Sequence, residues 1–138
     1  MADDVARLAA DLLEAWNTHS AERVVPFYAP DYEGVDVAEA VTQHGLRGIE
    51  HTLRRYLDAF PDLRFTGEDT VVQGDRVALI WTARGTHLGP LMRIPPTGRA
   101  VEVRGVSLLT LKDSKVTRAV YIWDVAALLR AIGLLPEL

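Results

Sequence analysis

The spacing of the hydrophobic residues changes halfway along this chain, and this change restricts the fold more than any other feature. Over residues 3–17 the apolar side chains recur every three or four positions, which predicts one buried helix face. Its members are Val5, Leu8, Ala9, Leu12, Leu13 and Trp16. The same spacing returns from Gly48 until Pro61, where proline ends the helix. Ser20 suits the N-cap of a short helix between them that ends near residues 26–28.

The second half of the chain has the composition of strands. Four segments are rich in Val, Thr, Leu, Ile and Trp and are separated by turn residues or by a loop, which predicts long antiparallel strands at 63–73, 76–87, 99–112 and 115–123. A shorter strand is predicted at 31–37, and residues 38–46 fit no pattern. Because the loop 88–98 contains three prolines, it cannot join a ladder and is expected to cross over or cover an opening. A last short helix is predicted over 124–132.

Helices followed by long strands predict an α+β domain with its helices on one face of an antiparallel sheet. Strands of this length twist strongly, so the sheet is expected to curl around the helices as a conical, half-open barrel. The concave side would hold the core at one end and a ligand pocket at the other. We expect residues 1–138 to form a single domain, because 138 residues match the usual domain size.

Composition removes several classes of function. The chain has no cysteine, which excludes disulfides and thiolate chemistry. Its net charge of -4 and lack of a polybasic tract argue against a nucleic-acid partner, and no apolar run approaches the ~20 residues of a membrane span. The N-terminus is acidic, unlike a secretory signal, so we expect a cytoplasmic protein. Without metal-ligand spacing or a phosphate-binding glycine loop, we expect no metal and no cofactor.

Asp124 is the first candidate for catalysis. It follows the apolar, aromatic strand end 119–123, where desolvation would favour a carboxyl group that acts as a base near neutral pH. It also opens the last predicted helix, and aspartate is a preferred N-cap. The sequence alone favours the cap, and the two roles are compatible.

His87 is the second candidate. Strand alternation places it on the same face as Trp81, near the rim of the sheet. Histidine is the side chain most often used for proton transfer near neutral pH, although a solvated histidine at a strand end is the commoner arrangement. His19 and His51 lie on or beside helices, where exposure is expected, and His44 lies in the unassigned segment.

Aromatic residues are the candidates for substrate binding. Tyrosine hydroxyls at a pocket mouth could orient a planar ligand, whereas aromatic residues on helix stripes are more often part of the core. The full set is Trp16, Tyr28, Tyr32, Tyr56, Phe60, Trp81, Tyr121 and Trp123. Arg104 is expected on the outside of its strand, paired with an acidic neighbour, with an anion-binding role as the alternative.

Several of these segments together resemble the SnoaL-like polyketide cyclases. The resemblance rests on Gly74-Asp75-Arg76-Val77-Ala78, Trp81-Thr82-Ala83-Arg84-Gly85-Thr86-His87, Ile94-Pro95-Pro96-Thr97-Gly98-Arg99, Val103-Arg104-Gly105, Tyr121-Ile122-Trp123-Asp124 and Gly133-Leu134-Leu135-Pro136. It also includes Ala59-Phe60-Pro61-Asp62-Leu63 and the Trp16-Asn17 helix end, and so spans most of the chain.

The resemblance implies the nuclear transport factor 2-like fold, which agrees with the cone predicted above. It also implies an intramolecular aldol condensation that closes the last ring of an aromatic polyketide ester without metal or cofactor. In that chemistry an aspartate removes a proton beside the ester carbonyl and later protonates the new alkoxide. The aspartate of the family's closing motif matches Asp124.

The chain departs from the family pattern at one strand. Cyclases of this type are expected to carry a histidine on the strand before the aspartate strand, and residues 99–112 contain none. The polar groups there are Glu102, Arg104, Ser107 and Thr110. His87, on the neighbouring strand, is the substitute that we predict.

We therefore predict a polyketide cyclase acting on an aromatic, largely apolar small molecule, with Asp124 as the catalytic acid and base and with His87 or a tyrosine hydroxyl assisting. The alternatives are a cofactor-free hydroxylase, isomerase or hydrolase in the same cone, and a non-catalytic module that binds a planar ligand. In a fourth interpretation the cone is filled and the sheet serves dimerisation, which a cavity below ~300 Å³ would support. Outward-facing apolar residues on the long strands predict a homodimer or homotetramer.

Overall fold

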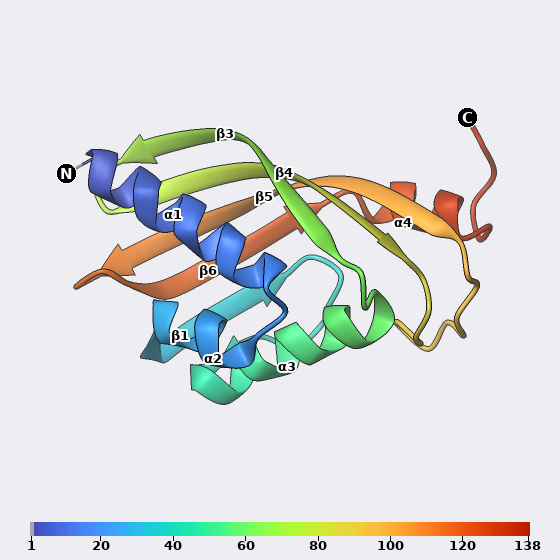
Figure 1. Ribbon diagram of the computed structural model, residues 1–138, viewed down its shortest axis with the longest axis horizontal. Coiled ribbons are helices and arrows are strands. Elements are labelled where there is room, and N and C mark those ends of the chain that lie inside the picture. Colours follow the sequence, from blue (N-terminus) through green and yellow to red (C-terminus); the bar gives the residue numbers. More distant parts are fainter. Residues whose placement is uncertain (1) are drawn as a thin grey trace.

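The computed structural model describes residues 2–138, and its helices and strands appear in the order expected from the sequence (Figure 1). The elements are α1 (Ala2–Asn17), α2 (Ala21–Val24), the 3-10 turn η1 (Val25–Phe27), β1 (Tyr28–Asp36), β2 (Gln43–His44), α3 (Gly45–Ala59), β3 (Arg64–Gln73), β4 (Arg76–Thr86), β5 (Ala100–Lys112), β6 (Lys115–Trp123) and α4 (Val125–Ala131).

The helices follow from the predicted apolar faces. In α1 the buried residues include Ala9, Leu12, Leu13 and Trp16, which are members of the stripe read from the sequence. Helix α3 begins three residues earlier than expected, at Gly45, whose φ of 67° suits glycine. It ends at Ala59, two residues before the proline. Ser20 stands at the N-cap of α2, but its side chain makes no capping hydrogen bond.

The strands form one six-stranded sheet in the order β2-β1-β6-β5-β4-β3. The four long strands make the predicted antiparallel meander from β3 to β6. The prediction of an entirely antiparallel sheet was wrong at β1, which pairs parallel to β6. A parallel neighbour needs a long crossover, and the helices and strands between β1 and β6 supply it. The unassigned segment 38–46 contains β2, which pairs with the end of β1.

The helices pack on one face of this sheet, and the strands curve around them (Figure 1). Helix α1 packs on β3 and β4, α3 packs on β1, and α4 packs on β5. A continuous apolar core joins residues of α1 and α3 to the inward-facing residues of β4, β5 and β6. The α+β fold with a curved sheet is therefore confirmed. None of the helices described over residues 2–138 combines the length and hydropathy of a membrane span.

Candidate functional site

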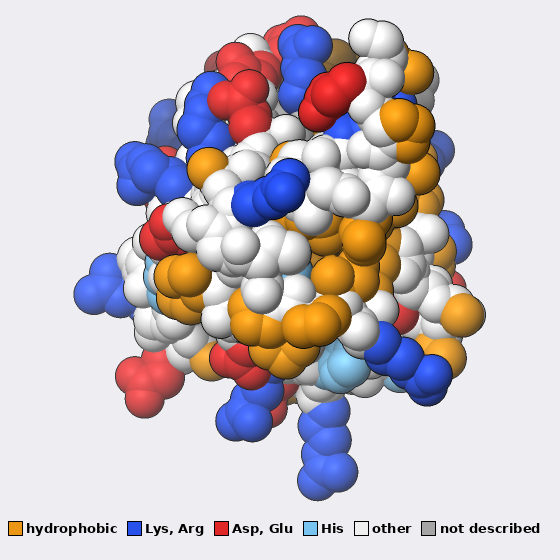
Figure 2. Space-filling view, turned by 90° about the vertical axis from the view of Figure 1, so that its right-hand side faces the viewer, with side chains coloured by type: hydrophobic (Ala, Val, Ile, Leu, Met, Phe, Trp, Pro, Cys, Tyr) orange, Lys and Arg blue, Asp and Glu red, His pale blue; other side chains and the backbone are white. Residues whose placement is uncertain are grey.

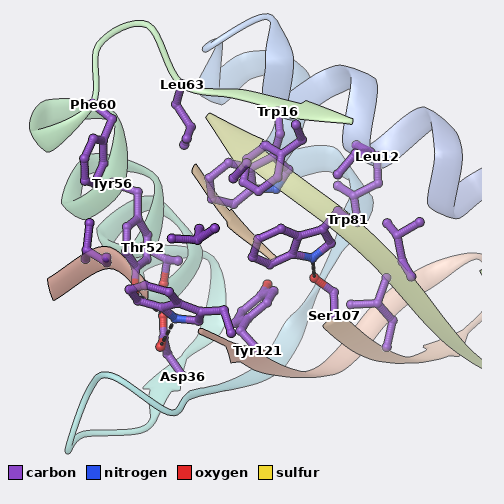
Figure 3. A pocket seen from close by; sticks show the side chains of 18 of the residues that line it. Leu12, Trp16, Asp36, Thr52, Tyr56, Phe60, Leu63, Trp81, Ser107 and Tyr121 are labelled. Carbon is purple, nitrogen blue, oxygen red and sulfur yellow. Dashed lines mark hydrogen bonds between the residues drawn. The ribbon is translucent and has the colours of Figure 1, made fainter. Parts of the chain in front are cut away.

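A pocket lies between the helices and the concave face of the sheet, with a volume of about 100 Å³ (Figure 3). It extends toward the end of the molecule that carries α4 and the C-terminal end of α3, because Phe60 and Leu128 belong to its lining. Figure 2 shows apolar side chains gathered in a hollow at this end. Most of the lining is aliphatic or aromatic, so a bound molecule would be largely removed from water.

Asp36 is the carboxylate inside this pocket. It is the last residue of β1, and its register partner is Tyr121 on β6. Only 6% of Asp36 is exposed. The backbone N–H of Ala38 donates to its Oδ1 at 2.8 Å, which closes a turn that holds the carboxylate at the strand end.

Two aromatic side chains supply the other hydrogen bonds to the Asp36 carboxylate. The indole Nε1 of Trp123, at the end of β6, donates to Oδ1 at 3.0 Å. The hydroxyl of Tyr56, from α3, donates to Oδ2. The two rings meet edge to face, with centroids 6.0 Å apart. Three neutral donors thus face a buried carboxylate, an arrangement that suits its acceptor-only ionised form.

Burial and the negative charge of Asp36 both raise the pKa of Tyr56 above its ordinary value. The phenol therefore keeps its proton at neutral pH and stays a donor to the carboxylate. One lone pair of Oδ2 remains without a donor among residues 2–138. That oxygen is suited to accept a proton from a bound molecule.

A second group of tyrosines lies next to Asp36. The hydroxyls of Tyr32 and Tyr121 are 3.1 Å apart, and the indole of Trp16 donates to the Tyr28 hydroxyl at 3.3 Å. Tyr28 and Tyr121 line the pocket. Burial is the main cause that raises the pKa values of Tyr28, Tyr32 and Tyr121. All three phenols consequently remain hydrogen-bond donors at neutral pH.

Asp124 lies at the N-cap of α4, and its side chain accepts from the backbone N–H of Ala127 at 2.9 Å. The residue is exposed and is not part of the pocket lining. The structure thus shows the capping interaction that the sequence favoured. The chain turns away from the sheet after Trp123, so the indole of Trp123 faces Asp36 while the carboxylate of Asp124 faces solvent.

His87 is completely buried, but it lies outside the pocket lining. Its Nδ1 lies 3.0 Å from the Thr97 hydroxyl and also accepts from the Thr97 backbone N–H. Its ring packs on Phe60 with centroids 5.6 Å apart. The expectation of a solvated residue near the rim was therefore wrong, because the loop 88–98 folds back over the histidine. In this position His87 holds the loop to the end of β4.

Seven of the nine predicted substrate-binding residues line the pocket, namely Trp16, Tyr28, Tyr56, Phe60, Trp81, Tyr121 and Trp123. Tyr32 is buried behind the lining, where it contacts the Tyr121 hydroxyl and packs edge to face on Tyr28. Arg104 is exposed on the outer face of β5, as expected. The expected pairing with an acidic neighbour was wrong among residues 2–138, because Glu102 pairs with Arg84 instead. The sequence thus identified most of the aromatic wall. Whether these residues bind a substrate stays a prediction.

The three polar pocket residues that the sequence analysis missed are Asp36, Thr52 and Ser107. Alternation along the predicted strand 31–37 places Asp36 on the same face as Tyr32, so a signal for Asp36 was present. The hydroxyl of Thr52 donates to the carbonyl of Gly48 within α3. Ser107 stands on an inward-facing position of β5, where it accepts a hydrogen bond from the Trp81 indole.

The volume of the pocket falls below the ~300 Å³ that we set above for the filled-cone interpretation. On this criterion the volume supports the interpretation in which the cone is filled, and a polycyclic ligand requires lining side chains to move. A wider depression of about 460 Å³ lies near the start of β3 and the adjoining ends of β4 and β5. It contains the ion pair between Arg84 and Glu102, at 2.6 Å, and so differs from an apolar ligand site.

The part of the chain that the structure describes contains no cluster of metal-ligating side chains. Among residues 2–138, no three His, Asp or Glu side chains are grouped closely enough to hold an ion. His19 is near the Leu63 carbonyl, and His51 pairs with Glu39 at 2.7 Å on the surface. His44 forms part of β2. The expectation of a metal-free and cofactor-free site stays a prediction.

The model of the SnoaL-like polyketide cyclase family matches residues 6–132, which include every element that lines the pocket. This chain belongs to that family. None of the curated protein sequences matches this family member. Solved structures confirm its nuclear transport factor 2-like, ketosteroid isomerase-like fold.

The solved structures that resemble this SnoaL-like chain at more than 25% identity include AclR and IdmH. AclR, a putative hydroxylase from Streptomyces galilaeus, is 27% identical with a TM-score of 0.87, over 100% of this chain and 90% of AclR. IdmH, a putative polyketide cyclase from Streptomyces antibioticus, is 28% identical with a TM-score of 0.80, over 94% of this chain and 98% of IdmH.

TerC, which was co-crystallised with polyporic acid, is more distant. It is 22% identical with a TM-score of 0.74, over 93% of this chain and 97% of TerC. This likeness shows a shared fold. At the coarser level, the chain is a SnoaL-like polyketide cyclase or a related tailoring enzyme.

Proposed function

We propose that this protein closes a ring in an aromatic polyketide ester by an intramolecular aldol reaction, with Asp36 as the acid and base. The observation that carries the proposal is a buried carboxylate with three fixed donors in an otherwise largely apolar pocket. Proton transfer between carbon and oxygen needs such a positioned carboxylate, and the apolar wall excludes water. Asp36 takes the role that the sequence assigned to Asp124, since Asp124 is exposed and caps a helix.

The chemistry runs in two steps. Oδ2 of Asp36 removes a proton from the carbon beside the ester carbonyl, and the electron pair of that C–H bond delocalises into the carbonyl as an enolate. The enolate carbon then forms a C–C bond to a ketone carbon of the same molecule. The ketone oxygen becomes an alkoxide, and it takes back the proton held on Asp36. Substrate and product are isomers, so no oxidant is consumed.

The remaining pocket residues would position the substrate. The rings of Trp16, Phe60 and Trp123 form walls for a planar molecule, and the Tyr121 hydroxyl can donate to an enolate oxygen. Because the described cavity is about 100 Å³, we expect it to open further when a polycyclic ester binds. That TerC was co-crystallised with polyporic acid supports a small-molecule ligand for a cone of this fold.

The test is turnover of an aromatic polyketide ester with and without oxygen. We expect an isomeric cyclised product at the same rate in air and under argon, and loss of that product in Asp36→Asn. Undiminished cyclisation in Asp36→Asn would overturn the assignment of the base. Cyclisation that needs Asp124 but not Asp36 would restore the assignment made from the sequence.

Hydroxylation is the second candidate, favoured by the 27% identity to AclR, a putative hydroxylase. It predicts a product one oxygen atom heavier and turnover that stops under argon. A binding module, the third alternative, predicts that the ligand is recovered unchanged. The same experiment therefore separates all three.

We also propose that the protein acts as a cytoplasmic homodimer or homotetramer that associates through the outer face of the sheet. Ile80, Val106 and Ile122 are register neighbours on β4, β5 and β6, and their side chains form an apolar row facing away from the helices. Ile122 is 51% exposed. We expect Val106→Glu to sediment as a monomer at concentrations where the wild type is oligomeric. A wild-type monomer would refute the proposal.

A further inference from the structure

Ser107 lies on the wall of the pocket away from Asp36, on the central strand β5 (Figure 3). Its register neighbours are Leu79 on β4 and Tyr121 on β6. Ser107 is only 9% exposed, and its side chain points into the cone. It therefore puts a hydroxyl group among largely apolar side chains.

The oxygen of this hydroxyl is already engaged. The indole Nε1 of Trp81 donates to Oγ of Ser107 at 2.9 Å. Trp81 is tightly held, because its ring meets Phe65 edge to face at 5.1 Å and lies against Gly105. A Cβ at Gly105 would come within 2.4 Å of Cη2 of Trp81, so glycine is required for this placement. The indole N–H is thus a donor fixed on Oγ.

The proton of the Ser107 hydroxyl has no such partner. Among residues 2–138 this hydroxyl donates no hydrogen bond, and the aliphatic side chains of Leu79 and Leu109 line the pocket with it. A buried donor without an acceptor costs free energy, which an acceptor in the pocket would recover. Acceptance of the Trp81 N–H also polarises the hydroxyl and strengthens it as a donor.

We propose that Ser107 binds a carbonyl oxygen of the ligand, and that the pocket prefers ring compounds with such an acceptor at the end remote from Asp36. This inference rests on the proposed function only in taking the same pocket as the ligand site. The carbon that loses its proton would lie next to the Asp36 carboxylate, and the Ser107 hydroxyl would orient the other end of the molecule. A hydrocarbon of the same shape gains nothing from Ser107.

Acetophenone and ethylbenzene test this subsite, because they have nearly the same shape and differ in one carbonyl group. Binding is followed by NMR through the indole N–H signal of Trp81, assigned with Trp81→Phe. In Ser107→Ala we expect acetophenone to bind roughly three- to tenfold more weakly and ethylbenzene to bind as in the wild type. Ser107→Thr, which keeps the hydroxyl, should retain acetophenone affinity.

Several results would overturn the subsite. An unchanged acetophenone affinity in Ser107→Ala would do so, as would an equal loss for both compounds. If neither compound binds the wild type, both the subsite and the ligand pocket are refuted. Should Ser107→Ala fail to fold, Ser107→Cys replaces it, because a thiol of similar size is a weaker donor. The acid and base role of Asp36 is tested separately. Full turnover in Asp36→Asn would refute that role without affecting the proposed Ser107 subsite.

Discussion

Two aspartates stand at the ends of neighbouring strands, and one is buried whereas the other is exposed. Asp36 ends β1 inside the cone, where it accepts hydrogen bonds from a backbone amide, an indole and a phenol. Asp124 follows β6 on the surface, where it accepts one hydrogen bond from the first turn of α4. The difference shows that the surroundings of a carboxylate at a strand end depend on what folds over it, and we propose that these surroundings give Asp36 its chemical role. Position in the sequence alone does not supply that role.

The strongest test of this comparison exchanges each aspartate for asparagine. We expect Asp36→Asn to lower the cyclisation rate by roughly 100-fold or more, since asparagine keeps the shape but accepts no proton. Asp124→Asn should keep the rate within about twofold, because asparagine is an equally good N-cap. Rates are measured on the same polyketide ester. Equal losses in both variants would remove the distinction between the two sites.

The phenols around the buried carboxylate give the next largest effect, on stability at high pH. Burial raises the pKa values of Tyr28, Tyr32, Tyr56 and Tyr121 above 10.0, the value expected in the unfolded chain. Above that pH the unfolded state loses protons that the folded state keeps. The contribution of these tyrosines to the free energy of unfolding should therefore be constant below about pH 9 and fall above pH 10, by at most ~1.4 kcal/mol per pH unit for each tyrosine.

Denaturant titrations between pH 8 and 11.5 measure this fall, and absorbance near 295 nm reports phenolate formation. The folded protein should show little phenolate at pH 10.5. Four tyrosines that ionise normally at pH 10 in the folded state would contradict the burial described here.

Tyr56→Phe tests one donor to Asp36. The ring and its contact with Trp123 remain, but Oδ2 loses the hydroxyl that positions it. We expect turnover to fall about tenfold, through kcat more than KM, because a hydrogen bond to a charged group is worth roughly 1.5 kcal/mol or more. Tyr32→Phe is the matched control, since its hydroxyl contacts Tyr121 and not Asp36. A larger loss in the control would place the key phenol elsewhere.

The smallest effect is expected from Asp124→Ala, which measures the contribution of the N-cap to stability. Loss of the hydrogen bond to the Ala127 N–H should lower the free energy of unfolding by about 1 kcal/mol, with turnover unchanged at temperatures where the protein is folded. Urea denaturation of the Ala and Asn variants measures the difference. A turnover defect in Asp124→Ala, without a matching loss of stability, would contradict the purely structural role.

Local patterns in the sequence were sufficient for most of the fold. The three- and four-residue spacing in 3–17 and the strand composition after residue 63 predicted the helices and the meander. They could not predict that β1 pairs parallel to β6, because that pairing joins residues more than 80 positions apart. The same long-range pairing brings Trp123 to Asp36. The carboxylate of the site was therefore missed although most of its aromatic wall was predicted.

The N-cap role of Asp124 could be predicted from the local sequence, and the structure confirms it. The exposure of Asp124 could not be predicted in this way, because exposure depends on the direction in which the chain leaves the sheet after Trp123. For His87, strand alternation predicted the correct inward face. The covering loop, held through Thr97, separates it from solvent in a way that alternation cannot predict.

The most direct test of the central claim is a crystal structure of the protein with a bound aromatic ketone or polyketide ester. We predict the ligand inside the cone, with its acidic carbon about 3–3.5 Å from Oδ2 of Asp36. Asp124 should remain on the surface as the cap of α4. A ligand held against Asp124, or bound outside the cone with Asp36 untouched, would contradict the account.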